Sequence, residues 1–309
     1  MQIYLPIAEI PVNILLILVL GLLTGFLAGM FGIGGGFLAT PLLMFIGIPP
    51  AVAVSTSANQ ITASSVSGLL AHLKRGNVDI KMGLMLLIGG FVGSGFGVLI
   101  FRILHKIGQI DIVVALTYVV FLGWIGSLMF IDSIKVIAGR KYGIKWKKRK
   151  KNRIVSILRM INDLPFKKHF PKSDVTVSII VPIAVGVFVG ILVSVMGIGG
   201  GFIMIPAMIY ILRMPSNVVV GTSLFQIIFI AGNVTFLQAV SNQTVDVVLG
   251  FLMIISSVIG AQFGTRASYK VNHDKSRMLL SIMILFVCFK MIATLFVYPE
   301  SLYNIEVIR

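Results

Sequence analysis

Long apolar segments separated by short polar turns recur along the whole chain, and their lengths fit a lipid bilayer. A spanning helix needs about 20 mostly apolar residues. Eight segments reach that length, at 11–31, 51–72, 82–103, 111–131, 177–196, 217–239, 247–267 and 277–298. Two shorter apolar segments, 34–47 and 199–212, accompany runs of glycine. The pattern predicts an all-α integral membrane protein.

The second half of the chain repeats the sequence of the first. Residues 25–60 read GFLAGMFGIGGGFLATPLLMFIGIPPAVAVSTSANQ, and residues 190–226 read GILVSVMGIGGGFIMIPAMIYILRMPSNVVVGTSLFQ. With one inserted residue the two copies align at Gly32/Gly197, Gly34/Gly199, Gly36/Gly201, Phe37/Phe202, Pro41/Pro206, Pro49/Pro215, Thr56/Thr222, Ser57/Ser223 and Gln60/Gln226. Repeated apolar halves broken by glycine and proline at equivalent places are typical of a transporter whose site lies between the repeats.

The repetition divides the chain into a first transmembrane repeat, 1–131, a basic segment, 132–176, and a second transmembrane repeat, 177–309. If the short segments cross the bilayer, each repeat makes five passes and the second is inverted. If they are re-entrant, both repeats keep one orientation. Only the inverted arrangement places the cations between 266 and 277 on the same side as the basic segment, as the positive-inside rule favours. We therefore expect two inverted repeats, each of four long segments and one short one.

The charge is concentrated in one place. The net charge is +16, and 14 of the 26 Lys and Arg residues lie between 135 and 172, where Asp163 is the only carboxylate. This segment is expected to be a cytoplasmic loop that fixes the orientation and rests on anionic lipid. Nucleic-acid binding is not expected, because the cations are not interleaved with aromatic residues and no known module is present.

The two glycine runs are the first candidate site. Exposed N–H groups and the positive end of the dipole at a helix N-terminus favour an anion, and glycine allows the main chain to approach it. The alternative is a simple break in a helix with no ligand. Because the runs occur at equivalent positions, we expect Gly34, Gly35, Gly36, Gly199, Gly200 and Gly201 to line a substrate site.

Polar residues inside the apolar segments are the second candidate. An unpaired amide in hydrocarbon costs several kcal/mol, so these side chains need partners or water. Hydrogen bonds between helices are the alternative to ligand binding. The polar residues at or beside repeated positions are assigned to the substrate site, and they are Thr56, Ser57, Asn59, Gln60, Thr222, Ser223 and Gln226.

The sequence offers no catalytic residue, metal site or cofactor motif. It has one cysteine, Cys288, and no nucleophile–base motif, metal-ligand cluster or phosphate-binding loop. An enzyme is therefore not expected. A neutral site of amides and hydroxyls beside helix N-termini suits a small anion better than a cation, which usually receives carboxylates or carbonyl rings.

The repeated motifs resemble those of the sulfite exporter TauE/SafE family. They are the duplicated G-x-G-G-G-F motif at 32–37 and 197–202, the prolines Pro41 and Pro206, and the paired Thr-Ser…Gln patterns. The resemblance covers 12–131 and 177–298. It implies a secondary transporter of the bacterial inner membrane that exports a small anion, either sulfite or an organosulfonate such as sulfoacetate. The alternative is a membrane scaffold that docks a partner through its basic segment. The sequence pattern is compatible with either a carrier or a channel.

Overall fold

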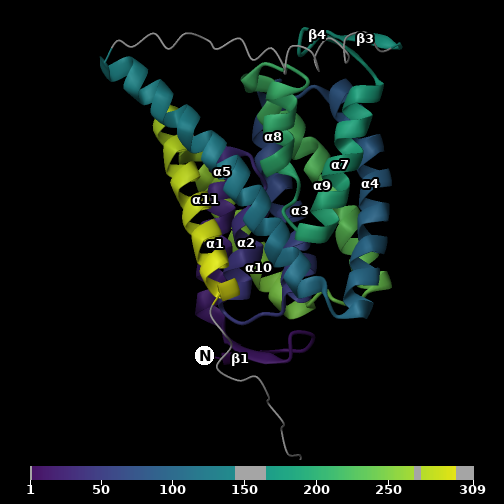
Figure 1. Ribbon diagram of the computed structural model, residues 1–309, viewed down its shortest axis with the longest axis vertical. Coiled ribbons are helices and arrows are strands. Elements are labelled where there is room, and N and C mark those ends of the chain that lie inside the picture. Colours follow the sequence, from purple (N-terminus) through teal and green to yellow (C-terminus); the bar gives the residue numbers. More distant parts are fainter. Residues whose placement is uncertain (1, 143–164, 268–272, 297–309) are drawn as a thin grey trace, which may run out of the picture.

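A computed structural model describes residues 2–142, 165–267 and 273–296 as a bundle of long helices with a small hairpin at either end (Figure 1). The helices are α1 (Ile14–Phe31), α2 (Gly36–Phe45), α3 (Pro50–Lys74), α4 (Ile80–Ile107), α5 (Ile110–Tyr142), α7 (Ile180–Met196), α8 (Gly201–Tyr210), α9 (Ser216–Ser241), α10 (Val247–Ala267) and α11 (His273–Phe296). The strands are β1 (Gln2–Leu5), β2 (Ile10–Asn13), β3 (Lys167–Phe170) and β4 (Val175–Ser178), and they form the antiparallel pairs β1–β2 and β3–β4.

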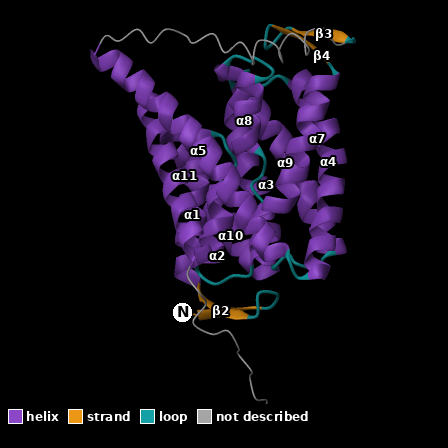
Figure 2. Cartoon of the chain, viewed as in Figure 1, coloured by secondary structure: helices purple, strands orange, loops and turns teal. Residues whose placement is uncertain are grey.

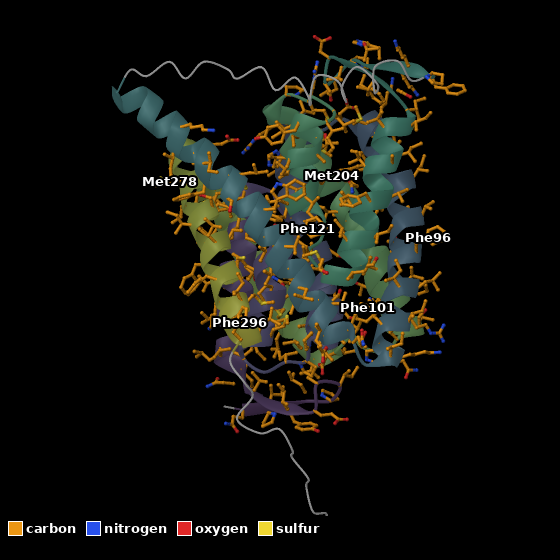
Figure 3. The ribbon with its side chains drawn as sticks, viewed as in Figure 1. Phe96, Phe101, Phe121, Met204, Met278 and Phe296 are labelled. Carbon is orange, nitrogen blue, oxygen red and sulfur yellow. The ribbon has the colours of Figure 1, made fainter. Side chains whose placement is uncertain are left out.

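The bundle presents an apolar outer surface, as a membrane requires. Among the described residues, six helices are long and apolar enough to cross a bilayer: α1, α4, α5, α9, α10 and α11. Large apolar side chains on these helices point away from the bundle; Phe96, for example, is 58% exposed (Figure 3). The all-α integral membrane fold expected from the sequence is therefore confirmed.

The structure differs from the expected segments in two respects. Helix α5 continues to Tyr142, past the expected boundary at 131, so the basic segment begins as helix. The hairpins β1–β2 and β3–β4 were not expected, because both are short and neither carries a glycine-containing turn. Residues 143–164 of the basic segment lie outside the described residues, and the expected contact with lipid there is untested.

The helices of one half pack mainly on helices of the other. Helix α1 packs along α10, and its counterpart α7 packs along α4. Helix α3 packs on its own counterpart, α9, and α5 packs on α11. Exchanging the two halves therefore leaves this set of pairs unchanged, which is what a two-fold relation between the repeats requires.

Glycines spaced four apart allow the closest of these contacts. A Cβ atom placed on Gly25 would lie 2.1 Å from the carbonyl oxygen of Ser257 in α10. A Cβ atom on Gly93 of α4 would lie 2.1 Å from the carbonyl oxygen of Val187 in α7. These glycines are structural, since only a residue without a side chain permits the main chains to approach so closely in a lipid environment.

The direction of the chain follows from the two hairpins, which lie at opposite ends of the bundle (Figure 2). Leu5 and Val12 of the first hairpin form one apolar cluster with Leu43 at the end of α2 and Val52 at the start of α3. The short helix α2 thus returns the chain to the end where α1 begins. Helix α8 lies toward the other end, the end that carries β3–β4 (Figure 1).

The outer ends of the short helices are attached to the pair formed by α5 and α11. The hydroxyl of Tyr210, at the end of α8, donates to Oδ2 of Asp132 in α5 over 3.0 Å. The ammonium of Lys290 in α11 lies 4.2 Å from the ring centroid of Phe45, at the end of α2. Phe45 and Tyr210 occupy equivalent positions in the repeats, so each short helix is held in a corresponding way.

Candidate anion site at the repeat interface

The glycine runs break the chain sharply between a long helix and a short one. Helix α1 ends at Gly32 with φ 68°, and α7 ends at Gly197 with φ 67°. Gly35 and Gly200, directly before α2 and α8, also have positive φ angles, 71° and 77°. Residues with a Cβ rarely adopt this left-handed conformation, so glycine is required at each turn.

The two runs meet in the middle of the molecule. A Cβ atom on Gly36 would lie 2.8 Å from the carbonyl oxygen of Gly197, and one on Gly201 would lie 2.4 Å from that of Ile33. Beside them, the rings of Phe37 and Phe202 stack with centroids 5.3 Å apart. The short helices therefore begin next to each other, and their N-terminal N–H groups and positive dipole ends lie at one place.

Helices α3 and α9 close over the glycine runs with equivalent isoleucines. The side chain of Ile61 lies 2.1 Å from where a Cβ of Gly36 would be, and 2.5 Å from that of Gly199. Ile227 lies 2.7 Å from the corresponding position on Gly201. All six predicted site glycines are buried, so in this conformation the central site is closed to solvent.

The glutamines adjacent to these isoleucines are fully buried and incompletely hydrogen-bonded. Gln60 donates from Nε2 to Oγ1 of Thr24 over 2.8 Å, but its Oε1 has no hydrogen-bond partner among the described residues. In Gln226, neither Nε2 nor Oε1 has such a partner. Both side chains have 0% exposure, so water does not reach them from outside either.

One substitution between the repeats explains this difference. The position equivalent to Thr24 is Val189, which offers no hydroxyl. The two residues are also equivalent in space: the Thr24 carbonyl oxygen lies 2.7 Å from a Cβ placed on Gly35, and a Val189 methyl lies 3.0 Å from one placed on Gly200. The second half therefore places an unsatisfied carboxamide where the first half has a hydrogen-bonded one.

Leaving a buried amide unpaired costs about 1–3 kcal/mol for each lost partner. Such groups are rare in folded proteins and call for an explanation, which a ligand, an ion or a functional strain can provide. A carboxamide N–H donates to anion oxygens, and the neighbouring helix N-termini supply further donors. The centre of the molecule therefore has the chemistry to bind a small oxyanion once it opens.

The predicted threonines lie away from this centre. Oγ1 of Thr56 accepts from the main-chain N–H of Asp246 over 3.1 Å, and Oγ1 of Thr222 accepts from that of Asp79 over 2.9 Å. Each aspartate caps the next helix, Asp246 at Leu249 N and Asp79 at Met82 N. These two threonines join the halves at the ends of α10 and α4 and do not converge with the glutamines.

The predicted serines lie nearer to the glycine runs. The hydroxyls of Ser57 and Thr40 share a short hydrogen bond. Ser223 donates over 2.8 Å to the carbonyl of Val220, with a longer contact of 3.4 Å to that of Gly32, the last residue before the first run. Both serines are fully buried.

Asn59 differs from the other predicted residues, because it is only partly buried and has no counterpart amide. Its Nδ2 atom lies 3.2 Å from where a Cβ of Gly250 would be, in α10. The equivalent residue, Phe225, faces Gly83 of α4 in the same way. Asn59 thus contacts a neighbouring helix and does not lie among the glycines.

Three residues at the centre were not predicted from the sequence: Thr24, Thr40 and Tyr118. Tyr118 of α5 is fully buried, and its hydroxyl donates over 2.6 Å to the carbonyl of Met196, next to the second glycine run. In the sequence these residues are distinguished only by a hydroxyl within an apolar segment. Many serines have the same feature, so it does not single out the central residues. Among the described residues no group of three or more His, Cys, Asp or Glu side chains could hold a metal ion.

Comparison with known proteins identifies the family to which the chain is similar. A family model described as "Sulfite exporter TauE/SafE" matches residues 17–291. No solved structure matches the chain significantly.

Several curated proteins are also similar. A probable membrane transporter protein, YunE of Bacillus subtilis, is 28% identical over 84% of this chain and 89% of its own length. A probable membrane transporter protein, MJ0441 of Methanocaldococcus jannaschii, is 25% identical over 87% of this chain and 91% of its own. Sulfite exporter TauE/SafE family protein 1 of Arabidopsis thaliana is 35% identical over 33% of this chain and 23% of its own.

Proposed function

Because the chain belongs to the sulfite exporter TauE/SafE family of membrane transporters, we propose that it is a secondary carrier that exports a small sulfur oxyanion. The substrate is sulfite or an organosulfonate, and the site is the centre where the two glycine runs meet. The protein is a transporter and not an enzyme.

The observation that supports this site most strongly is the pair of buried glutamines at equivalent positions. Nε2 of Gln226 is a buried donor with no partner among the described residues, whereas Nε2 of Gln60 donates to Thr24 and would have to exchange that partner for the anion. Both glutamines lie near glycines with positive φ angles that precede helix N-termini. A sulfonate or sulfite group offers three oxygens, so it can accept from carboxamide and main-chain N–H groups together.

In this proposal the halves are inverted repeats that move relative to each other around the central site. The reciprocal pairs α1–α10 and α4–α7 are rigid, because their main chains touch through glycine. Helices α3 and α9 cover the site and carry most of the polar residues. A change in the α3–α9 contact would open the centre at one end while the other stays closed.

The end of the bundle that carries β3–β4 is cytoplasmic in this proposal. Several cations lie toward that end, as the helix directions indicate: Lys74, Arg75, Lys172, Arg213 and Arg266. Nζ of Lys172, in the β3–β4 hairpin, lies 3.4 Å from where a Cβ of Gly76 would be, just after α3. Such an excess of cations follows the positive-inside rule. A potential negative inside then favours expulsion of an anion by about 2.3 kcal/mol per charge per 100 mV.

The test is flux of labelled sulfite from proteoliposomes, with sulfoacetate, taurine, thiosulfate and sulfate as competitors. We expect saturable flux, and we expect Gln60→Ala and Gln226→Ala each to abolish it without loss of folded protein. Absence of flux for every sulfur anion would reject the proposed function. Normal flux in both variants would keep a transporter and reject this site.

A further inference from the structure

A second polar feature lies outside the central site, in a pocket of about 460 Å³ between the ends of α3 and α10. Lys74 and Arg75 contribute from α3, and Arg266 contributes from α10. Ser67, Gln262 and Thr265 add hydroxyl and amide groups, and within the part of the chain that the structure describes no carboxylate lines the pocket. We refer to these six residues as the basic pocket. The positive charges gathered around this cavity attract an anion.

The basic pocket lies on the same face of α3 as the buried glutamine. At 100° per residue, positions 60, 64, 67, 71 and 74 fall within about 40° of one line along the helix. Gln60, Ser64 and Ser67 lie on this line in the direction of the C-terminal end of α3, and Lys74 is the last residue on it. Ser67 lies about 10 Å along the axis from Gln60, because each residue rises 1.5 Å. The polar side chains at 60, 64 and 67 therefore lead along α3 from the buried carboxamide of Gln60 to the basic pocket, which Ser67 lines.

The other repeat lacks the cations and the middle residue of this row. The positions equivalent to Ser64, Lys74 and Arg266 are Ile230, Val240 and Leu99. Ile230 is buried, whereas Val240 and Leu99 are 64% and 55% exposed. The counterparts of Ser67 and Arg75 are Asn233 and Ser241, so the corresponding face keeps some polar residues but has none of the three cations. The two ends of the transport path thus differ in charge although the repeats are similar in sequence.

We infer that the basic pocket is a loading site that captures the substrate oxyanion from the β3–β4 side and delivers it along α3 to Gln60. The inference rests on the proposed function and adds to it the side from which the anion is collected. A positive, partly enclosed cavity raises the local anion concentration and its rate of capture, and this effect weakens with salt. An anionic lipid phosphate offers the same chemistry as the free oxyanion, so the experiment separates the two.

The experiment uses the full chain in phosphatidylcholine vesicles, sorted by an affinity tag inserted in 143–164 so that the orientation is known. Labelled sulfite is supplied to each face in turn, to the native protein and to a Lys74→Gln/Arg266→Gln variant. The matched control is Arg102→Gln/Lys106→Gln. It removes two exposed cations near the C-terminal end of α4, away from the basic pocket. Each measurement is repeated in vesicles containing phosphatidylglycerol and at high salt.

The expected result is a KM for sulfite about fivefold higher in the pocket variant, at low salt and only for the β3–β4 face, with kcat unchanged. The control should behave as the native protein. An unchanged KM, or an equal rise at both faces, would overturn the inference. A change confined to vesicles with phosphatidylglycerol would assign the pocket to lipid phosphate instead.

A failure of the proposed function can be distinguished from a failure of this inference by a binding measurement. If the native protein carries no sulfur anion, equilibrium binding of labelled sulfate to the protein in phosphatidylcholine nanodiscs tests the basic pocket alone. Binding that the pocket variant loses and the control retains would keep an anion site there. Absence of binding to the native protein would overturn it.

Discussion

The main-chain N–H of Asp246 donates a hydrogen bond of 3.1 Å to Oγ1 of Thr56, a residue in the other half of the chain. The same bond recurs between their counterparts, from Asp79 to Thr222 over 2.9 Å. Equivalent residues thus make equivalent bonds at two separate places. The recurrence ties the repeated sequence directly to how the halves are held together.

Replacing either threonine by valine should destabilise the protein to a similar degree. Thr56→Val and Thr222→Val each leave a buried N–H without its acceptor, at a cost of about 1–3 kcal/mol. The measurement is the apparent Tm in detergent. Thr117→Val is the control, because the Thr117 hydroxyl bonds only the Val113 carbonyl within its own helix in the described structure. Loss of stability at one threonine but not at the other would contradict the equivalence.

Close packing through glycine predicts a sharp contrast within α4. Gly93→Ala places a methyl 2.1 Å from the Val187 carbonyl oxygen, whereas nothing lies within 4 Å of a Cβ on Gly95. Overpacking costs about 1–3 kcal/mol and sometimes more. Gly93→Ala should therefore reduce the yield of folded protein in size-exclusion chromatography, and Gly95→Ala should leave it unchanged or raise it. Equal yields would show that α4 and α7 separate easily.

The unpaired amide of Gln226 predicts opposite effects on stability and transport. Gln226→Leu removes two buried polar atoms that lack partners, so the apparent Tm should rise by a few degrees, about 1 kcal/mol or more. Sulfite flux should fall to background, because the ligand donor is lost. Gln60→Leu is the matched comparison; it also breaks the bond to Thr24 and should gain less stability. A lower Tm for Gln226→Leu would mean that Gln226 is satisfied in the protein.

Supplying the missing hydroxyl tests the same difference between the repeats. Val189→Thr should give Gln226 the partner that Thr24 gives Gln60, and it should raise the apparent Tm without abolishing flux. Val193→Thr is a fair control, since that side chain also touches Gly200. If both variants lose stability equally, the Val189 side chain does not face Gln226.

Much of the fold follows from the sequence, because hydrophobic length and glycine spacing act locally. The eight long and two short segments correspond to the ten described helices, and the glycines at intervals of four lie at the closest contacts. The hairpins were missed because four-residue strands carry little periodicity. The extension of α5 to Tyr142 was missed because the increase in charge there also suits a loop.

The site was less predictable, because partners far apart in sequence decide each side chain's role. Thr56 and Gln60 share a helix face, yet one bonds Asp246 and the other reaches Thr24. The isolation of Gln226 depends on Val189, whose relevance appears only once α7 is placed against the glycine run. The duplicated motif identifies the neighbourhood of the site but not the residues that remain unpaired within it.

Alternating access between the halves can be measured by the accessibility of single cysteines. In a Cys288→Ser background, which removes the only native thiol, Ser64→Cys and Ile230→Cys place single thiols one turn beyond Gln60 and Gln226. Both positions are buried and lie toward opposite ends of the bundle. For alternating access, a membrane-impermeant thiol reagent should label Ser64→Cys only from the β3–β4 side and Ile230→Cys only from the opposite side. Sulfite should change the two labelling rates in opposite directions. Simultaneous labelling of both, with rates that sulfite moves together or not at all, would contradict it.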